Sequence, residues 1–532
     1  MESTSFDKFY PWFIAAIIAS LIPGLFTPLM EPDAALYAGI SKQIVLRNDW
    51  INLYANGANW LDKPHLPFWL GAASFSVFGI NAFAWKLPAF ICWLIGAIYT
   101  FKFARHFYGQ HAGKVSALIY LCALHAVISS NDVRAEPYLT LFLIAASYHL
   151  VKAMQQGIHI IPAALFTAFA LMTKGPFVLI PLGAGMFLHW AMTGNWRQLY
   201  NPRWYLWLLL TAIFTSPEII CLYLQFDAKP EQLVFGQQGV SGIRFFLWDS
   251  QFGRFFNTGP IKGKGDPTFF LHTLLWAFLP WSLLFYAALF QRLRKIKEGV
   301  EWITLGAGLL TLIVFSLSRF QLPHYLNILF PYFAIMLAAW LQGLQKEGLR
   351  TATIIQRVVA MIMIVLAAGI DILFRGPGWW AYLAVAGAAV IVWSLRRGTR
   401  NIVLVSATGS IALAIFLNVF FYPHLLQYQG GTTAARWLNR QHIQEPVYPY
   451  RITSYSLDFY YKGRVKWEGQ GQLLYTARKG KTALDSAGIP YNIIRTIPSY
   501  KVTRLDGKFV NASTRNKSLD TAWLIRTAAI VP

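Results

Sequence analysis

Charged residues are scarce in this sequence of 532 residues. Only 13% are Asp, Glu, Lys or Arg, whereas 56% are hydrophobic, and soluble globular domains carry about 25% charged residues. A water-soluble fold cannot hide that much apolar surface. The scarcity of charge therefore excludes an ordinary soluble domain and favours a chain that lies largely in a lipid bilayer.

Cysteine is also rare. The three cysteines fall inside apolar runs, where a thiol behaves as a small core side chain. We therefore predict that they form neither disulfides nor a metal site. We predict no metal and no cofactor for the chain as a whole. The three residues are Cys92, Cys122 and Cys221.

Acidic residues are half as frequent as basic ones, 23 against 46, which gives a net charge of +23. A nucleic-acid partner is not the prediction, because much of the excess lies in short loops between apolar runs, where membrane orientation explains it. An anionic membrane surface or an anionic substrate is a second possible reason.

Long apolar runs replace the missing charge. Runs of about 20 apolar residues match a hydrocarbon core about 30 Å thick, and this length rule predicts about thirteen membrane helices. The first run precedes Glu31-Pro32-Asp33 and not a small-residue cleavage site, so we expect it to be retained. The spans are predicted at 10–30, 84–104, 114–131, 137–153, 158–173, 176–192, 204–224, 269–291, 301–318, 322–342, 354–374, 378–395 and 401–422.

Basic clusters occur in alternate short loops, which marks these loops as cytoplasmic. They fall on one side if the N-terminus is cytoplasmic and the number of spans is odd. The C-terminal segment then lies outside the cytoplasm. The clusters are Lys102, Arg105 and Lys114; Arg197 and Arg203; Arg292, Arg294, Lys295 and Lys297; Lys346 and Arg350; and Arg396, Arg397 and Arg400.

The external face carries two long loops and a separate domain. Residues 31–83 are predicted to form amphipathic helices at the membrane interface. Residues 225–268 show no strong periodicity, so we expect a partly mobile cover. We divide the chain into a transmembrane domain, 1–424, and an extracytoplasmic α/β domain, 425–532, with a helix at 433–441 and a strand at 446–452.

Several charged and polar residues lie beside the outer ends of the predicted spans. A charged side chain at membrane depth is costly. Several such side chains at one level on one side of the membrane therefore indicate a functional site. Two carboxylates and several cations there suit the binding of a phosphate and the activation of a nucleophile. The alternative is that each is a solvated loop charge. The residues are Asp33, Asp62, Lys63, Arg134, Glu136, Lys174, Arg319, His324 and Tyr325.

Four motifs follow one another within residues 10–345. They are EPDAALYAGISKQI with LDKPHLPFWL, then Arg134-Ala135-Glu136, then Thr173-Lys174-Gly175-Pro176, and finally SLSRFQLPHYLNILFP. This ordered set resembles the GT-C glycosyltransferases, in particular the branch with the bacterial lipid A aminoarabinose transferase and the protein O-mannosyltransferases. The resemblance implies an all-α polytopic membrane fold with a small external α/β domain.

The same resemblance implies roles for individual residues. Asp33 falls on the family's catalytic aspartate, and Glu136 falls where the family has a second carboxylate. Lys63 falls on a Lys-Pro motif that contacts the donor phosphate, and Tyr325 falls on the family's tenth-span tyrosine. Arg319, Tyr325 and Lys174 are further candidates for the donor phosphate, and Asp62, Arg134 and His324 complete the candidate set.

The sequence departs from the family at three positions. Ala34 replaces an acid, Leu36 replaces an arginine, and Gln321 stands where a lysine is common. One acid and one cation are therefore missing beside Asp33. These changes leave the acceptor and the choice of donor open.

We therefore expect an enzyme of the bacterial inner membrane that transfers a sugar from a polyprenyl-phosphate donor to a cell-envelope acceptor. The acceptor is a lipid A-like glycolipid or another glycan. A protein O-glycosyltransferase of the same fold is the alternative. A transporter of lipid-linked sugars is less favoured, because its charges would gather at the membrane midplane. The C-terminal domain is also open to interpretation as a module that recruits acceptor.

Overall fold

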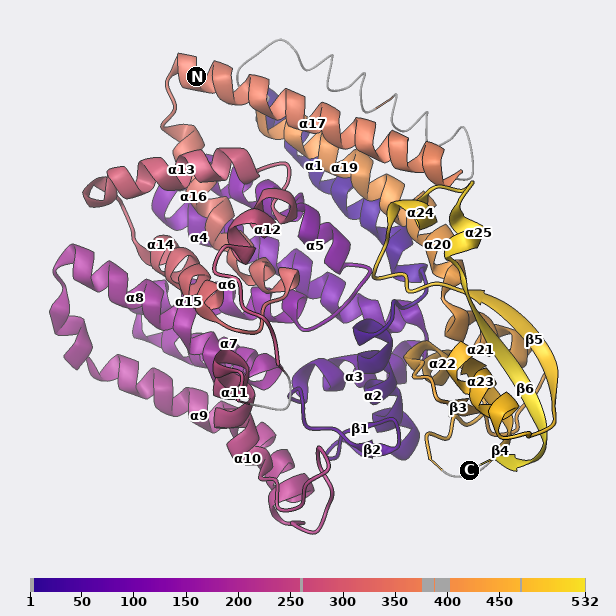
Figure 1. Cartoon of the computed structure of the whole chain (residues 1–532). Helices are drawn as coiled ribbons and strands as arrows, with labels where there is room; N and C mark the ends of the chain where they lie inside the picture. Colours follow the sequence, from indigo (N-terminus) through magenta and orange to yellow (C-terminus); the bar gives the residue numbers. More distant parts are fainter. Residues whose placement is uncertain (1–3, 259–261, 376–386, 388–401, 469–470, 532) are drawn as a thin grey trace.

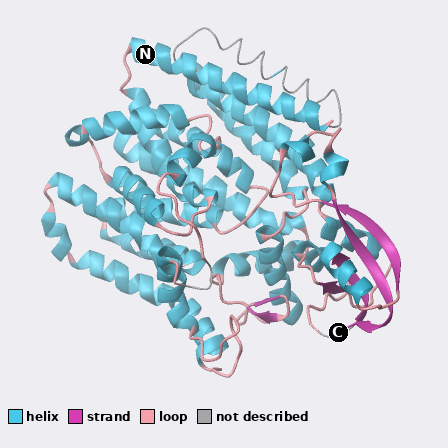
Figure 2. Ribbon diagram, in the orientation of Figure 1, coloured by secondary structure: helices cyan, strands magenta, loops and turns pink. Residues whose placement is uncertain are grey.

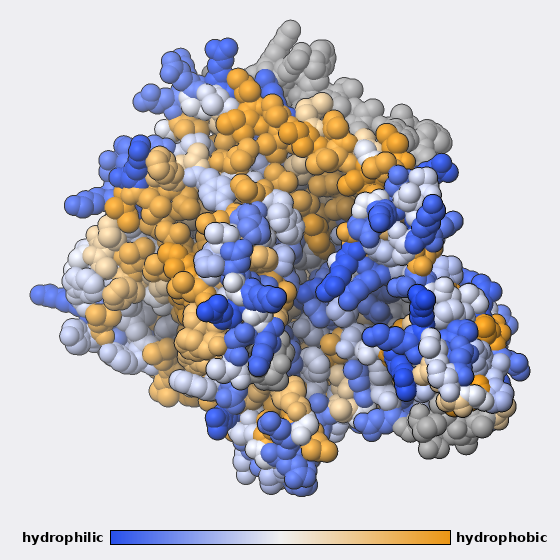
Figure 3. Space-filling model, viewed as in Figure 1, coloured by the Kyte–Doolittle hydropathy of each residue, from blue (hydrophilic) through white to orange (hydrophobic). Residues whose placement is uncertain are grey.

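Long apolar helices make up most of the molecule (Figures 1 and 2). The computed structural model describes residues 4–258, 262–375, 387, 402–468 and 471–531. Within these residues, eight helices are long and apolar enough to cross a membrane. Figure 3 shows apolar side chains over the helical part and hydrophilic ones over the C-terminal domain at the right. The chain is a polytopic membrane protein.

Eight predicted spans correspond to regular helices. The predicted span at 378–395 and the basic residues Arg396, Arg397 and Arg400 lie outside the described residues. The helices are α1 (Thr4–Leu21), α6 (Glu136–Ala153), α7 (Ile160–Lys174), α8 (Leu179–Thr193), α9 (Pro202–Leu222), α16 (Phe330–Gln342), α17 (Lys346–Phe374) and α19 (Ile402–Ile415). The ends of α6, α7, α8 and α9 agree with the predicted spans within three residues, whereas one or both ends of α1, α16, α17 and α19 differ by more.

Two other predicted spans, 114–131 and 269–291, are interrupted, whereas the span at 84–104 is intact. Helix α4 (Ala82–Leu121) has non-helical geometry at Gly109, whose φ of 85° favours glycine, and its second part ends before the short helix α5 (Leu124–Ser129). The span predicted at 269–291 is two helices, α12 (Phe269–Ala277) and α13 (Ser282–Arg294), which flank Pro280. A proline ring cannot continue a helix without loss of a hydrogen bond.

Single π turns extend or join several helices. The span predicted at 301–318 consists of α14 (Ile303–Leu305), a π turn and α15 (Thr311–Leu317). Helix α9 continues as a π turn to Asp227, and α19 continues through another to α20 (Tyr422–Leu425). The last predicted outer junction becomes a 3-10 helix, Pro323–Leu329, before α16.

The first of the two long loops, which the sequence predicts to be external, contains two helices and a hairpin. These are α2 (Asp33–Arg47), strands β1 (Tyr54–Ala55) and β2 (Ala58–Asn59), and α3 (Leu66–Phe78). Ten of the fifteen residues of α2 are buried, and it packs between α3 and the C-terminal domain. It therefore differs from the amphipathic surface helix that the sequence predicted.

The second external loop is more regular than predicted. Residues 242–256 form a continuous helical segment made of α10 (Gly242–Arg244), a π turn and α11 (Ser250–Phe256). The segment after it is held by the next predicted motif, because Gln321 Oε1 accepts a hydrogen bond from the Asp266 backbone N–H at 2.9 Å. Short-range periodicity missed this helix because the three pieces are brief.

The C-terminal residues form the predicted α/β unit. Its sheet has the order β3-β4-β6-β5, with β3 parallel to β4 and the other pairs antiparallel. The predicted helix and first strand are present as α21 and β3. The elements are α21 (Gly430–Arg440), β3 (Tyr448–Tyr450), α22 (Tyr455–Tyr460), β4 (Gly471–Ala477), α23 (Arg478–Ser486), β5 (Tyr491–Ser499), α24 (Gly507–Val510), α25 (Arg515–Ser518) and β6 (Asp520–Val531).

Polar contacts fix this unit to the first external loop. Gln429 donates to the Leu29 carbonyl at 2.9 Å and accepts from the Glu31 backbone N–H at 2.9 Å. The Glu31 carboxylate accepts from the Ser454 hydroxyl at 2.8 Å. The segment just before α2 is therefore held by the C-terminal domain.

Candidate functional site

Six of the predicted site residues form one connected group. They come from the start of α2, the loop before α6, the start of α6, the end of α7 and the 3-10 helix before α16. Residues far apart in sequence therefore meet at one level, as predicted. The six are Asp33, Arg134, Glu136, Lys174, His324 and Tyr325.

Arg134 links the first two motifs. Its guanidinium contacts the Asp33 carboxylate at 2.7 Å and the Asp132 carboxylate at 2.7 Å. Its Nε also donates to Asp132 at 2.9 Å. A planar guanidinium suits such two-sided pairing. Asp132, which the sequence analysis did not single out, thus fixes Arg134 against Asp33.

Glu136 is the centre of the second part of the group. Its carboxylate contacts Lys174 Nζ at 2.6 Å and lies 3.8 Å from His324 Nε2. The Lys174 ammonium also lies 4.0 Å from the centre of the Tyr325 ring, a cation–π geometry. Lys174 ends α7 because Gly175 follows with a φ of 95°.

The two carboxylates differ in access. The Asp33 side chain is 32% exposed, whereas that of Glu136 is 3% exposed and paired with Lys174. Burial raises the pKa of the Asp33 carboxyl above its ordinary value, although Arg134 opposes the rise. A raised pKa makes a carboxylate a stronger base once it is ionised. Asp33 is therefore the carboxylate that an incoming group can reach.

Lys63 and Asp62 lie beside this group as a pair, with Nζ and Oδ2 2.9 Å apart. Lys63 and Lys174 line one small cavity of about 20 Å³ together with Gln251 from α11. That volume holds about one water molecule. The cations of the site are thus close to carboxylates, and a phosphate must exchange partners with them in order to bind.

Arg319 has no contact with the group among the described residues. Its side chain is exposed, and its backbone N–H donates to the Phe255 carbonyl at 3.2 Å. Gln321, which departs from the family pattern, donates to the Phe315 and Ser316 carbonyls. The SLSRFQ part of the last motif is therefore tied to the loop of residues 225–268. His324 and Tyr325, later in the same motif, reach the group.

Ala34 and Leu36, the other two departures, are buried in α2. Leu36 belongs to the main hydrophobic core. Neither residue leaves an opening at the surface beside Asp33. The missing acid and cation are therefore replaced by packing.

A buried ion pair that was not predicted from the sequence holds the chain next to Lys63. It joins His65, two residues after Lys63, to Glu218. His65 Nδ1 lies 2.9 Å from the Glu218 carboxylate, which also accepts from the His65 backbone N–H at 3.0 Å. The other ring nitrogen lies 2.9 Å from the Ile51 carbonyl. A signal was present in the sequence, since Glu218 is a charge inside an apolar helix.

A second buried network positions the residues around Asp132. Lys86 is fully buried and donates to the Gly24 carbonyl at 2.8 Å and to the Thr27 hydroxyl at 2.7 Å. The Thr27 hydroxyl donates to Asn131 at 3.1 Å. The chain before α2 and the chain before Arg134 are therefore joined by hydrogen bonds. Like Glu218, Lys86 is a charged residue inside an apolar helix, and this was visible in the sequence.

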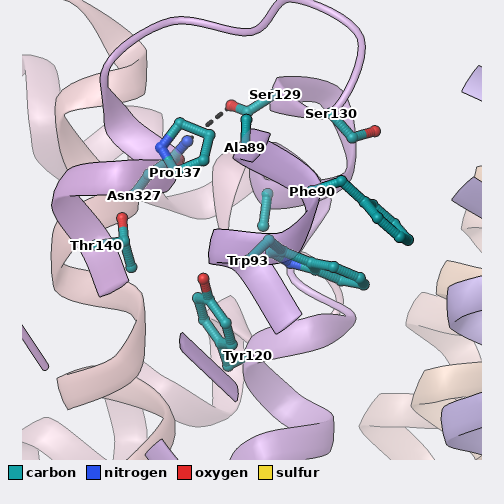
Figure 4. A pocket seen from close by; sticks show the side chains of 10 residues that line it. Ala89, Phe90, Trp93, Tyr120, Ser129, Ser130, Pro137, Thr140 and Asn327 are labelled. Carbon is teal, nitrogen blue, oxygen red and sulfur yellow. Dashed lines mark hydrogen bonds between the residues drawn. The ribbon is translucent and has the colours of Figure 1, made fainter. Parts of the chain in front are cut away.

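Figure 4 shows a small pocket beside the start of α6. Ser129 accepts from the Asn327 side chain at 2.7 Å, while Asn327 Oδ1 and Trp93 Nε1 are buried without a hydrogen-bond partner. The pocket volume of about 20 Å³ suits a single water. It is too small for a sugar or a prenyl chain.

Known proteins share sequence and fold with this chain. A family model described as dolichyl-phosphate-mannose-protein mannosyltransferase matches residues 62–221. An undecaprenyl phosphate-alpha-4-amino-4-deoxy-L-arabinose arabinosyl transferase from Edwardsiella ictaluri is 26% identical over 357 residues, which are 64% of this chain and 61% of that protein. One from Yersinia pestis is 24% identical and covers 72% and 71%.

The solved structures decide the fold. The crystal structure of ArnT from Cupriavidus metallidurans bound to undecaprenyl phosphate superposes with a TM-score of 0.77, at 16% identity, over 99% of each chain. The chain has the GT-C fold of ArnT. The predicted resemblance and fold class are therefore confirmed. The chain spans about three fifths of the length of the Edwardsiella relative and of a second one from Sodalis glossinidius, 61% and 62%.

The pair of His65 and Glu218 should make the stability of the fold depend on pH. Burial lowers the pKa of His65, but the Glu218 carboxylate outweighs burial and places the pKa above its usual value. The protonated pair therefore stabilises the fold fully below pH 6.5, the ordinary pKa of a histidine side chain, and the stabilisation is lost as pH rises through the raised pKa. Glu218→Gln should lower the free energy of unfolding by about 1–3 kcal/mol at pH 6, and by less at pH 9.5.

Thermal unfolding in detergent at the two pH values measures this difference. Glu231→Gln is the control, because Glu231 is exposed and has no ion pair among the described residues. An equal loss at both pH values would show that the charge on His65 does not matter.

Proposed function

We propose that the protein transfers a sugar from a polyprenyl-phosphate carrier to a cell-envelope glycolipid. The names of the relatives suggest 4-amino-4-deoxy-L-arabinose on undecaprenyl phosphate as the donor. The observation that carries the proposal is the accessible Asp33 carboxylate beside the cations Lys63, Lys174 and Arg134. A lipid A-like glycolipid is the proposed acceptor, as the sequence resemblance implies.

The proposed reaction balances without a further reactant. The acceptor oxygen forms a bond to the anomeric carbon, and the bond from that carbon to the phosphate oxygen breaks. The polyprenyl phosphate leaves with the bonding electron pair, so no strong acid is required. When the acceptor is a hydroxyl, its proton passes to Asp33 as general base. When the acceptor is a phosphate, Asp33 stabilises positive charge at the anomeric carbon.

The cations serve the leaving phosphate in this proposal. Lys63 and Lys174 are near enough to line one cavity, and both lie beside carboxylates that a phosphate can displace as partner. Glu136 then holds Lys174 in place and is not the base, because it is almost completely buried. Tyr325 and His324 orient Lys174 and Glu136.

The proposed location is a bacterial inner membrane, with the reaction on the extracytoplasmic side. The basic loop between α8 and α9 and the end of α13 lie on the left of Figure 1, opposite the C-terminal sheet. Basic short loops mark the cytoplasmic side. The N-terminus is then cytoplasmic, and the C-terminal domain, 425–532, is external.

A protein O-glycosyltransferase is the second candidate. The matching family model, which covers residues 62–221, carries the name of protein mannosyltransferases. A lipid-linked sugar transporter is less favoured because the charged group lies at helix ends. The acceptor that gains the sugar separates the two enzymes, and a transporter would release no polyprenyl phosphate.

Asp33→Asn tests the proposed chemistry. We expect kcat to fall about a hundredfold or more, the scale of general-base catalysis, with little change in the KM for donor. The purified protein is incubated with undecaprenyl-phosphate aminoarabinose and lipid A, and the product is measured by mass spectrometry. In the wild type, the rate should rise with pH through a raised Asp33 pKa, and this acid limb should be absent in the variant.

Two further variants make the result specific. Asp520→Asn removes an exposed carboxylate of the C-terminal domain and should have wild-type activity. Glu136→Gln should lose activity because Lys174 is no longer held in place by the carboxylate. Normal turnover by Asp33→Asn alongside an inactive Glu136→Gln would assign the base to Glu136 instead.

Lys63→Ala tests the proposed phosphate contact. A hydrogen bond to a charged group contributes about 1.5–3 kcal/mol, so the KM for donor should rise about tenfold to a hundredfold. Lys63→Arg should restore little, because a guanidinium does not replace a compact ammonium. Steady-state kinetics with varied donor measures the effect, and Lys229→Ala, at an exposed loop cation, is the control. An unchanged KM in Lys63→Ala contradicts this role.

Reporter fusions test the proposed orientation. Fusions after Arg203 and Leu293 should report a cytoplasmic location, and a fusion at the end of the chain should report an external one. The physical reason is the retention of basic loops on the cytoplasmic side. A cytoplasmic C-terminus would place the charged group on the wrong side for the proposed reaction.

A further inference from the structure

A large cavity lies away from the charged group of the site. Its volume is about 1120 Å³, and it is lined by the C-terminal half of α2, the β1–β2 hairpin and residues 458–468 of the C-terminal domain. Figure 1 shows the hairpin beside this part of the domain. We call this space the basic cavity.

Cations dominate the lining of the basic cavity. Six Lys or Arg residues face two carboxylates, Asp458 and Glu468. Lys42 is already engaged, since its ammonium donates to the Asp458, Phe459 and Tyr461 carbonyls. The other five cations are exposed and have no ion pair among the described residues: Arg47, Arg436, Lys462, Arg464 and Lys466.

Such a group of like charges repels itself unless an anion enters. The segment 462–466 is fixed by its backbone and not by ion pairs of its side chains among the described residues. The Val447 N–H donates to the Arg464 carbonyl, and the Lys466 N–H donates to the Val447 carbonyl, each at 3.0 Å. The side chains are therefore available for a ligand.

The uncharged lining suits a sugar. Asn56, Asn81 and Asn439 offer amide groups, and Tyr54 and Trp467 offer aromatic rings. Arg47 lies over the Tyr54 ring at 4.1 Å, so the cation and the ring form one surface. Polar groups placed among aromatic side chains are typical of small-ligand sites.

Apolar side chains lie along one edge of the basic cavity. Leu46 lines it and is exposed, and Val77 and Phe78, exposed at the end of α3, lie just before the lining residue Ile80. An exposed apolar edge beside a charged space fits an amphiphile that is anchored in a membrane. A protein acceptor would not require it.

We propose that the basic cavity binds the phosphate-bearing sugar portion of a glycolipid acceptor, while the sugar to be modified reaches Asp33. This inference rests on the proposed function. Lys42 lies nine residues after Asp33 in α2, about 14 Å at 1.5 Å per residue. The acceptor must therefore extend over more than one sugar.

Direct binding tests the proposal on the full-length protein in detergent, without donor. The probe is a deacylated glucosamine disaccharide with two phosphates, and thermophoresis gives its affinity. The triple variant Lys462→Ala, Arg464→Ala and Lys466→Ala should bind about tenfold more weakly, because each exposed charge contact contributes about a factor of two. The variant should also have a raised KM for acceptor and an unchanged KM for donor.

The control triple variant is Arg478→Ala, Lys479→Ala and Arg495→Ala. It removes the same charge from exposed positions of the same domain outside the basic cavity, and its affinity should stay within twofold. Equal affinity of the two triple variants would overturn the proposal. Equally tight binding of the disaccharide without phosphates would also overturn it.

Inorganic phosphate separates a plain anion site from a site for a phosphorylated sugar. We expect it to compete only at concentrations well above those of the disaccharide. Equally tight binding of phosphate alone would overturn the sugar assignment. Because binding is measured without donor, absence of transfer activity would refute the proposed function and leave the binding result to be judged separately.

Discussion

The contact between Arg134 and two carboxylates is the interaction on which the arrangement of the site depends. Asp33 begins α2, and Asp132 precedes α6, so the guanidinium connects an external loop helix to a membrane helix. Burial of these charges is tolerable only because they pair. The network of Lys86, Thr27 and Asn131 holds the two chain segments that carry the carboxylates. Removal of Arg134 would leave the partly buried carboxylates of Asp33 and Asp132 without their partner.

Pairing also explains how the site holds its cations without a ligand. Glu136 and Lys174 neutralise one another, and Asp62 stands beside Lys63. In the proposed reaction a donor phosphate enters as a competing anion. The protein thus keeps cations at helix ends near the membrane surface without the cost of leaving them uncompensated.

Much of this was accessible from the sequence. Apolar length predicted the helices, because a bilayer imposes one dimension on every span, and the cost of charge at helix ends predicted the group that includes Asp33, Arg134 and Glu136. The break at Gly109 falls between two predicted spans, 84–104 and 114–131. The break at Pro280 was missed because composition averages over a run and does not register a single residue. Arg319 was placed in the site by its motif, but the backbone contacts of its loop direct it elsewhere.

Pairing partners were the hardest part to predict. Glu218 pairs with His65, 153 positions earlier in the chain, and no local pattern names that partner. Asp132 pairs with Arg134, two positions later, but the contact of Arg134 with Asp33 is again between distant residues. The environment of α2 was also missed. Its burial arises from the C-terminal domain, about 400 positions later in the chain, and no window of local periodicity contains that contact.

Helix α2 has a consequence for selectivity on the proposed function. One end carries Asp33 and the other lines the basic cavity, and the helix between them is enclosed by packed neighbours. A packed helix has a constant rise, so the separation between the two places is set by the number of residues in it. Acceptors would then be sorted by the spacing between their anionic group and the reacting oxygen. A glycan with the right groups at the wrong separation would occupy one place and miss the other.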